Sequence, residues 1–274
     1  MSRSSSLFVA IAATAATVLG SVIGFTGEAF AGNVRPVQPL GPSDDGVELQ
    51  DIFDDLYRSG VGVDAIDDQI SAALFENTAV GGSVSSFVAE IAGFAGKNKI
   101  GLYNKNLTKA LLYDGVNDDG DTAFVTFLEG GDLSIITKGF APKNKPPLVD
   151  KLYEKFGNCF GFYIETPEGN TFYSEDWRNP NGDAQVLIYQ GENDTVLQLP
   201  NRAKGLFTDN EFLIAFEDKV YANSDKDFND AVISFESILP KKDVPEPGAV
   251  VGLLAIGSFG VSQMLKRHKQ ENKN

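Results

Sequence analysis

The chain has 274 residues, and its 38 acidic and 23 basic residues give a formal net charge of −15. Such an acidic surface repels nucleic acid and anionic lipid, so we expect no nucleic-acid partner. The single cysteine, Cys159, excludes an intrachain disulfide. The single histidine, His268, lies near the C-terminus, which excludes a Ser-His-Asp triad and histidine-ligated zinc from the preceding part of the chain.

Residues 1–31 have the pattern of a secretory signal peptide. Arg3 is followed by an uncharged run from Ser4 to Gly27, and small residues stand at Ala29 and Ala31. A basic start, an apolar middle and a small-residue cleavage site predict processing after Ala31. We therefore expect the rest of the chain to be exported.

The next two segments, residues 32–45 and 46–80, differ in their periodicity. Residues 32–45 contain three prolines and no apolar period, which predicts an extended arm. Residues 46–80 predict a pair of short helices. The first has an apolar stripe over residues 49–57, and the second runs from Asp64 to about Glu76 with acidic residues in its first turn, where the helix dipole favours them.

Residues 81–240 read as a mainly β domain, because short apolar runs alternate with Gly, Asn, Asp and Pro. Turn signals every eight to twelve residues predict a β-sandwich, jelly-roll-like in form. The clearest hairpin joins two strands through Thr166 to Gly169. Residues 138–155 predict a long loop that ends in a helical turn at 148–155. Strands are expected near residues 85–93, 99–104, 109–113, 122–128, 132–137, 158–165, 170–174, 184–190, 195–199, 211–217 and 231–237.

The densest chemistry lies in residues 212–235, where two strands flank an acidic loop. Five carboxylates this close repel one another unless a cation or backbone N–H groups lie among them. Calcium takes six to eight oxygen ligands from such loops. The loop is no EF-hand, because Phe228 and Ser234 stand where that loop needs Gly and Glu. Alternatively, the acidic residues cap turns without a metal. The candidate metal ligands are Glu217, Asp218, Asp225, Asp227 and Asp230.

Two further segments allow a functional and a structural interpretation. The acidic loop at residues 114–121 could bind calcium, but a hairpin loop with Asn and Gly at positive φ explains it as well. The group Phe172, Tyr173 and Trp177 could form a sugar-stacking face, or Trp177 could cover apolar side chains beside a turn.

The C-terminal part predicts a membrane anchor. Residues 247–265 carry no charge, and a helix of this length spans roughly 28 Å, close to the thickness of a bilayer core. We place the transmembrane helix at residues 248–265. The cations that follow, Lys266, Arg267 and Lys269, orient it with the preceding chain outside the cytoplasm.

An extended box directly before this helix consists of Val244, Pro245, Glu246 and Pro247. Box, hydrophobic helix and basic tail together resemble the PEP-CTERM sorting signal of exported bacterial proteins, over residues 244–270. The resemblance implies recognition and removal of the tail by exosortase, and an association with exopolysaccharide secretion. It further implies export across the inner membrane, transient anchoring, and a final location at the cell surface or outside the cell.

A second resemblance involves the acidic segment itself. Residues 215–218 (Ala-Phe-Glu-Asp) and 225–230 (Asp-Lys-Asp-Phe-Asn-Asp), followed by an apolar strand, resemble the hallmark of an uncharacterised domain family of exported bacterial proteins. The similarity includes residues 161–164 and 172–174. It implies an extracellular β domain in which the five candidate ligands have a calcium role, without implying an activity.

Two functions remain after these exclusions. The preferred hypothesis is a non-enzymatic, calcium-stabilised surface or extracellular-matrix protein associated with polysaccharide. The alternative is an extracellular polysaccharide-active hydrolase that uses a carboxylate pair, since the chain has many acids and such an enzyme needs no histidine. No glycine-rich phosphate loop follows a predicted strand, so we expect no nucleotide cofactor.

Overall fold

The computed structural model describes residues 35–44, 46–78, 82–89, 96–117, 119–139 and 148–241. The predicted signal peptide with Ala29 and Ala31 lies outside these residues. So do the sorting box at 244–247, the predicted membrane helix at 248–265 and the cations Lys266, Arg267 and Lys269. The predictions of export, sorting and anchoring therefore stay predictions.

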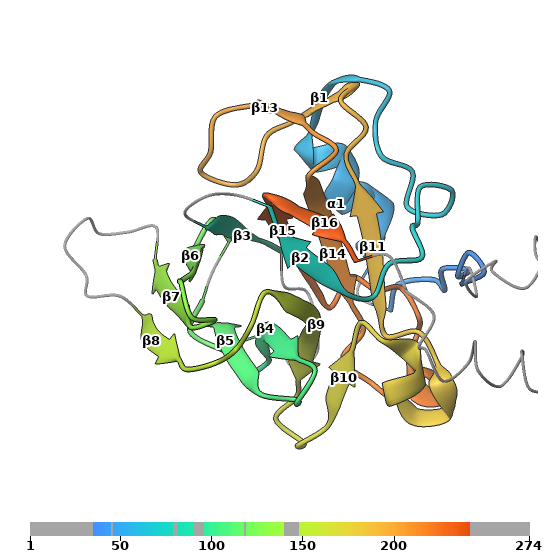
Figure 1. Ribbon diagram of the computed structural model, residues 1–274. Helices are drawn as coiled ribbons and strands as arrows, with labels where there is room; N and C mark the ends of the chain where they lie inside the picture. Colours follow the sequence, from blue (N-terminus) through green and yellow to red (C-terminus); the bar gives the residue numbers. More distant parts are fainter. Residues whose placement is uncertain are drawn as a thin grey trace, which may run out of the picture. The chain divides into compact units, whose positions relative to one another are not determined.

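The largest layer is a seven-stranded antiparallel sheet (Figure 1). Some neighbouring strands in the centre of this sheet are consecutive in the chain, whereas others are far apart in sequence. Its order is β11 (Val186–Gln190), β14 (Glu211–Phe216), β15 (Ala231–Glu236), β3 (Ser83–Ala89), β6 (Thr122–Phe127), β7 (Leu133–Lys138) and β8 (Val149–Tyr153).

Two smaller antiparallel sheets accompany it. The six-stranded sheet has the order β16 (Ile238–Pro240), β2 (Phe75–Asn77), β9 (Cys159–Glu165), β4 (Lys99–Asn104) and β5 (Lys109–Tyr113), and β10 (Thr171–Tyr173) also pairs with β9. The three-stranded sheet has the order β1 (Tyr57–Gly60), β12 (Thr195–Leu197) and β13 (Gly205–Phe207). The expected β9–β10 hairpin is confirmed, with Phe172 opposite Ile164.

The main hydrophobic core lies between the two larger sheets. Alternate residues of β14, such as Phe212 and Ile214, enter it together with Phe75 and Phe162 from the six-stranded sheet. The ring of Phe75 meets those of Phe162 and Phe212 edge-on, at centroid distances of 5.3 and 5.2 Å. Fully burying each such ring contributes about 1.5–3 kcal/mol, so this aromatic contact joins the two layers.

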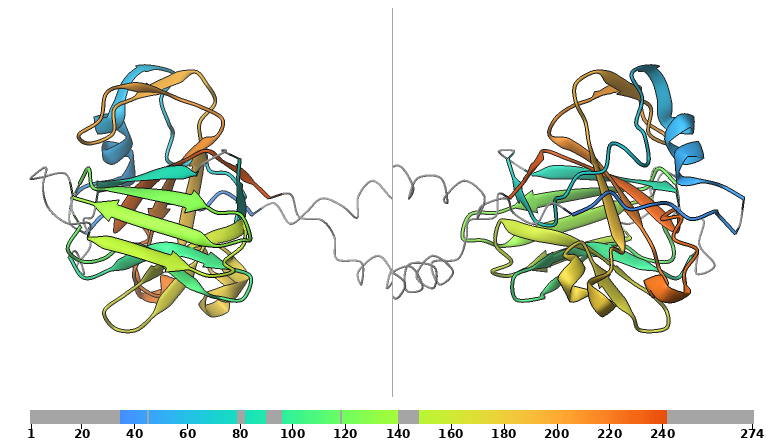
Figure 2. Two further views of the ribbon diagram at one scale, coloured as in Figure 1. Left: turned by 60° about the vertical axis from the view of Figure 1, so that its left-hand side comes forward. Right: turned by 90° about the vertical axis from the view of Figure 1, so that its right-hand side faces the viewer.

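A second core covers the opposite face of β11, β14 and β15. The helix α1 (Leu49–Leu56) buries its apolar stripe there, and the three-stranded sheet adds Leu197 and Phe207. Phe53 of the helix meets Tyr189 edge-on at 4.8 Å. Figure 2 shows α1 and the three-stranded sheet on the same side of the molecule. Because these strands are buried on both faces, their sequences are continuous apolar runs.

Of the two predicted helices, the first is confirmed and the second is wrong. The first helix is α1, but residues 64–68 form a turn and residues 75–77 form strand β2. The carboxylate of Asp64 accepts hydrogen bonds from the backbone N–H groups of Ile66 and Asp67, both at 2.8 Å, which closes a turn and lowers the pKa of Asp64. Fully buried Phe75 pairs with Phe160 of β9, so core packing decides the strand.

The predicted helical turn at residues 148–155 is also wrong, because Val149–Tyr153 is strand β8 and pairs with β7. The short strands β1, β13 and β16 were not expected; each has three or four residues, too few for a periodic signal. The arm at residues 35–44 forms neither helix nor strand. It is held in place, since Arg35 donates a hydrogen bond to the carbonyl of Val186 at 2.8 Å.

The predicted mainly β class is confirmed by three antiparallel sheets and one α-helix in the described chain. The face-to-face packing of the two larger sheets agrees with a sandwich, while the jelly-roll form stays a prediction. In the part of the chain that the structure describes, no helix combines the length and hydropathy needed to cross a membrane.

Candidate metal centre

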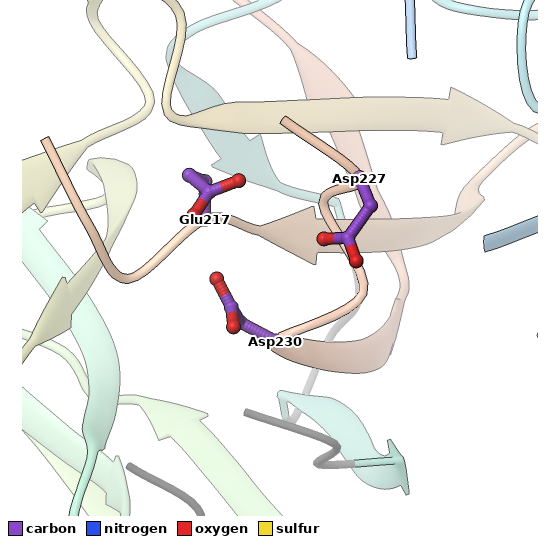
Figure 3. Close-up of side chains that lie close together, drawn as sticks. All are labelled: Glu217, Asp227 and Asp230. Carbon is purple, nitrogen blue, oxygen red and sulfur yellow. The ribbon is translucent and has the colours of Figure 1, made fainter. Parts of the chain in front are cut away.

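The register of β14 and β15 brings the acidic residues together. Phe216 opposes Ala231 at the end of this pair, so the next residues outward, Glu217 and Asp230, lie side by side. The 3-10 helix η4 (Tyr221–Asn223) lies in the loop between the strands, and Asp227 returns toward the same point (Figure 3). One hairpin end therefore supplies the three carboxylates.

The loop reaches this position through unusual backbone conformations. Lys226 and Phe228 have φ of 67° and 55°, a left-handed region that costs a side-chain-bearing residue roughly 1–2 kcal/mol. Phe228 is fully buried in the second core, which holds the loop against that cost. The arm approaches from outside, where the N–H of Gly41 donates to the carbonyl of Lys226 at 2.9 Å. A Cβ at Gly41 would lie 1.7 Å from the carbonyl oxygen of Asp225, so only glycine fits.

The three carboxylates form a tight, buried group. One oxygen each from Glu217, Asp227 and Asp230 lies within 4.8 Å of the other two, and the residues are 0%, 1% and 5% exposed. Figure 3 shows the three carboxylates turned toward a common point. Burial, reinforced by the charge of Asp230, raises the pKa of Glu217, and burial also raises the pKa of Asp230. Without a cation, the raised pKa favours the protonated form of Glu217, which shares its proton with Asp230.

Glu217 is poorly supplied with hydrogen-bond donors in this group. Asp230 accepts a hydrogen bond from the backbone N–H of Asp218 at 2.7 Å. Glu217 accepts only a long one, 3.5 Å, from the N–H of Lys219 through Oε1. Among the described residues, no donor reaches its buried Oε2. A buried carboxylate oxygen without a donor costs free energy that a bound cation would recover.

The donor set matches a hard cation. All three side chains offer carboxylate oxygens, which suit calcium, magnesium or manganese, whereas zinc and copper sites draw on nitrogen and sulfur. The buried acidic cluster could therefore hold a metal ion, with further ligands from backbone carbonyls or water.

The other two predicted ligands lie beside the cluster. The Oδ2 atom of Asp218 accepts a hydrogen bond from Asn98 Nδ2 at 2.9 Å, while its backbone N–H positions Asp230. Asp225 is half-buried, and its charge helps to raise the pKa of Glu217. Asn98 was not expected at the site, and no local pattern could have revealed it, because 120 residues separate it from Asp218.

Internal hydrogen bonds favour the structural interpretation of the second acidic loop. Asn117 donates to Asp121 at 2.8 Å and accepts from the N–H of Asp114, also at 2.8 Å, as a side chain closing a turn does. In the candidate sugar-stacking face, by contrast, the Trp177 ring is exposed. Trp177 lies in the 3-10 helix η2 (Asp176–Arg178), is 68% exposed, and has the guanidinium of Arg178 4.0 Å from its ring centroid.

Comparisons with protein families, with curated proteins and with solved structures find no significant match to this chain.

Proposed function

We propose that this chain is an exported surface or extracellular-matrix protein whose β domain is stabilised by calcium and has no enzymatic role. One observation supports the metal most directly: Glu217, Asp227 and Asp230 converge in the interior, and the buried Oε2 of Glu217 has no donor in the described chain. The signal-peptide and sorting patterns at the two ends support the location, including exosortase processing and contact with exopolysaccharide.

Calcium fits the cluster better than magnesium. Magnesium requires near-ideal octahedral geometry and keeps several waters, so it favours open sites with one or two protein carboxylates. This cluster presents three carboxylates that are at most 5% exposed. Calcium accepts six to eight oxygens in irregular arrangements, including backbone carbonyls of a loop such as residues 218–229.

The same burial argues against the hydrolase. A polysaccharide-cleaving carboxylate pair must touch its substrate, whereas Glu217 is fully buried and Asp230 is 5% exposed. A hydrolase would therefore need a different pair. Incubating the protein with exopolysaccharide from its own source tests this: release of reducing sugar, abolished by one carboxylate-to-amide change, would refute the non-enzymatic proposal.

Thermal unfolding of residues 32–242 tests the metal. Both cores are formed by residues within this fragment. After treatment with chelator, calcium at about 100 times its Kd should add about 2.7 kcal/mol, or roughly 5–10 °C in Tm. Magnesium at the same concentration should give a smaller shift.

The variant Asp227→Asn tests whether the calcium-induced rise in Tm comes from binding at the cluster. The change removes one negative charge but keeps the size of the side chain, so the calcium-induced shift should fall to less than about half. Asp209→Asn, an exposed acid in the turn before β14, is the matched control and should respond to calcium as the unaltered protein does. If chelator and calcium leave the Tm of the unaltered fragment unchanged, the metal proposal is wrong.

Delivery is tested separately by mass spectrometry of the protein from its native cell. The proposal requires loss of residues 1–31 and of the segment after the box at 244–247. A C-terminus intact at Asn274 would refute the processing.

A further inference from the structure

A cleft lies at the other end of the β14–β15 hairpin from the acidic cluster, between the seven-stranded and three-stranded sheets. Its floor is the face of β14, β15 and β3 that carries the second core, where Glu211, Leu213 and Glu236 project. Its roof is the β12–β13 hairpin, which supplies Leu206 and Phe207. The cleft has a volume of about 280 Å³, or roughly nine waters at about 30 Å³ each, and is large enough for a small organic molecule.

The walls combine an apolar body with one charged end. Leu197, Leu206, Phe207 and Leu213 supply the apolar surface, and Leu206 at the rim is 47% exposed. A mostly apolar concavity with a few convergent polar groups is the usual form of a small-ligand site.

The charged end consists of two carboxylates placed opposite each other. Glu211 and Glu236 are direct cross-strand partners, so their Cβ atoms lie about 4.5–5.5 Å apart on one face of the sheet. Like charges in this arrangement repel. None of the ion pairs among the described residues includes either of them.

Arg202 compensates the two negative charges only in part. Arg202 lines the cleft, but its guanidinium donates to Thr122 Oγ1 at 2.6 Å. Burial and the charge of Glu211 raise the pKa of Glu236 more than Arg202 lowers it. Glu211 is held in place because its Oε2 accepts the N–H of Thr208 at 2.8 Å.

We infer that this cleft binds a small organic cation, with its ammonium group between Glu211 and Glu236 and its apolar chain along Leu206 and Phe207. The site is distinct from the acidic cluster at the other hairpin end, and it does not rest on the calcium proposal. An ammonium group relieves the carboxylate repulsion, and a short alkyl chain covers the apolar walls.

An NMR titration of the isotope-labelled 32–242 fragment with n-hexylammonium, at constant calcium, tests the inference. Amide shifts give both the Kd and the place of binding, which should include Leu206 and Phe207. n-Hexanol has the same chain without the charge and should bind at least about tenfold more weakly, because its hydroxyl group cannot form an ion pair with the two carboxylates. Equal affinity for hexanol, or no binding of hexylammonium, would overturn the inference.

Glu236→Gln separates binding from folding. The variant should bind hexylammonium about tenfold more weakly, while its unliganded Tm stays the same or rises, because the repulsion with Glu211 is removed. Glu129→Gln, an exposed acid in the β6–β7 turn, is the control and should leave the affinity unchanged. If Glu236→Gln binds as tightly as the unaltered protein, the carboxylate pair is not the site.

Discussion

The β14–β15 hairpin carries a carboxylate pair at each end, and the two ends differ in almost every other respect. At one end, Glu217 and Asp230 are sealed in the interior with Asp227. At the other, Glu211 and Glu236 face a cleft open at its rim. The pairings at the two ends belong to one register, in which 211 opposes 236 and 216 opposes 231.

Burial accounts for the difference in chemistry. At the sealed end, the loop over residues 225–228 closes on the cluster and the arm at Gly41 covers the loop, so repulsion is stronger in the lower dielectric. Only protons or a compact, fully coordinated cation can relieve it there. At the open end, solvent and salt screen the pair, and a larger cation can enter.

The largest expected effect on stability comes from Phe228→Ala, which should open the loop that covers the buried end. Phe228 is fully buried and anchors the acidic loop in the second core. Its truncation should destabilise the fragment by about 3–5 kcal/mol and should abolish the calcium-induced rise in Tm, since the loop loses its position. Urea unfolding with and without calcium measures both effects.

Phe124→Ala is the matched control. Phe124 is 44% exposed on β6 of the same sheet, so the same truncation should cost far less. A calcium response that survives Phe228→Ala would show that the cluster does not depend on the closed loop.

A smaller effect should follow from pH in the metal-free protein. The pKa of Glu217 is raised in the folded state, so at pH 7 the folded protein holds a proton that the unfolded chain has released. Stability must therefore fall as the pH rises above about 4.5, the ordinary pKa of this side chain, and the loss reaches about 3 kcal/mol at pH 7.

Calcium should remove this pH dependence, because the bound cation favours the ionised carboxylates. The measurement is the free energy of unfolding between pH 5 and 8, in chelator and in excess calcium. Metal-free stability that rises with pH in this window would contradict the raised pKa of Glu217.

The sequence predicted the strands well where local pattern and tertiary packing agree. The runs that became β4, β9 and β14 are apolar and bounded by turn residues. The prediction was wrong at residues 64–76, where an apolar stripe suited a helix equally well. There, the pairing of Phe75 with Phe160, far along the chain, decided the outcome.

The location of the candidate site was predicted, and all three cluster residues were among the five candidate ligands, because carboxylates are dense in this segment. Two further residues, Asp218 and Asp225, were also assigned to the site. Whether Asp218 pointed into the cluster or toward Asn98 depended on a segment 120 residues away. The opposed pair of Glu211 and Glu236 was not considered, because its meaning depends on the register and on the roof that β13 provides.

The smallest expected effect is the gain in stability from Glu236→Gln, and its dependence on salt concentration distinguishes the two ends. Glu236→Gln removes one charge from a cross-strand pair, so it should stabilise the unliganded fragment by about 0.2–1 kcal/mol at low ionic strength. Because this pair is only half-buried and lines a cleft, the gain should shrink as salt rises to about 1 M, where the Debye length is about 3 Å. The pH dependence attributed to Glu217 should persist at the same salt concentration, since buried charges are screened much less. Unfolding free energies of both proteins across a salt series test the contrast. A gain from Glu236→Gln that salt does not reduce would place this pair, too, in the interior and would remove the physical difference from which the two binding proposals follow.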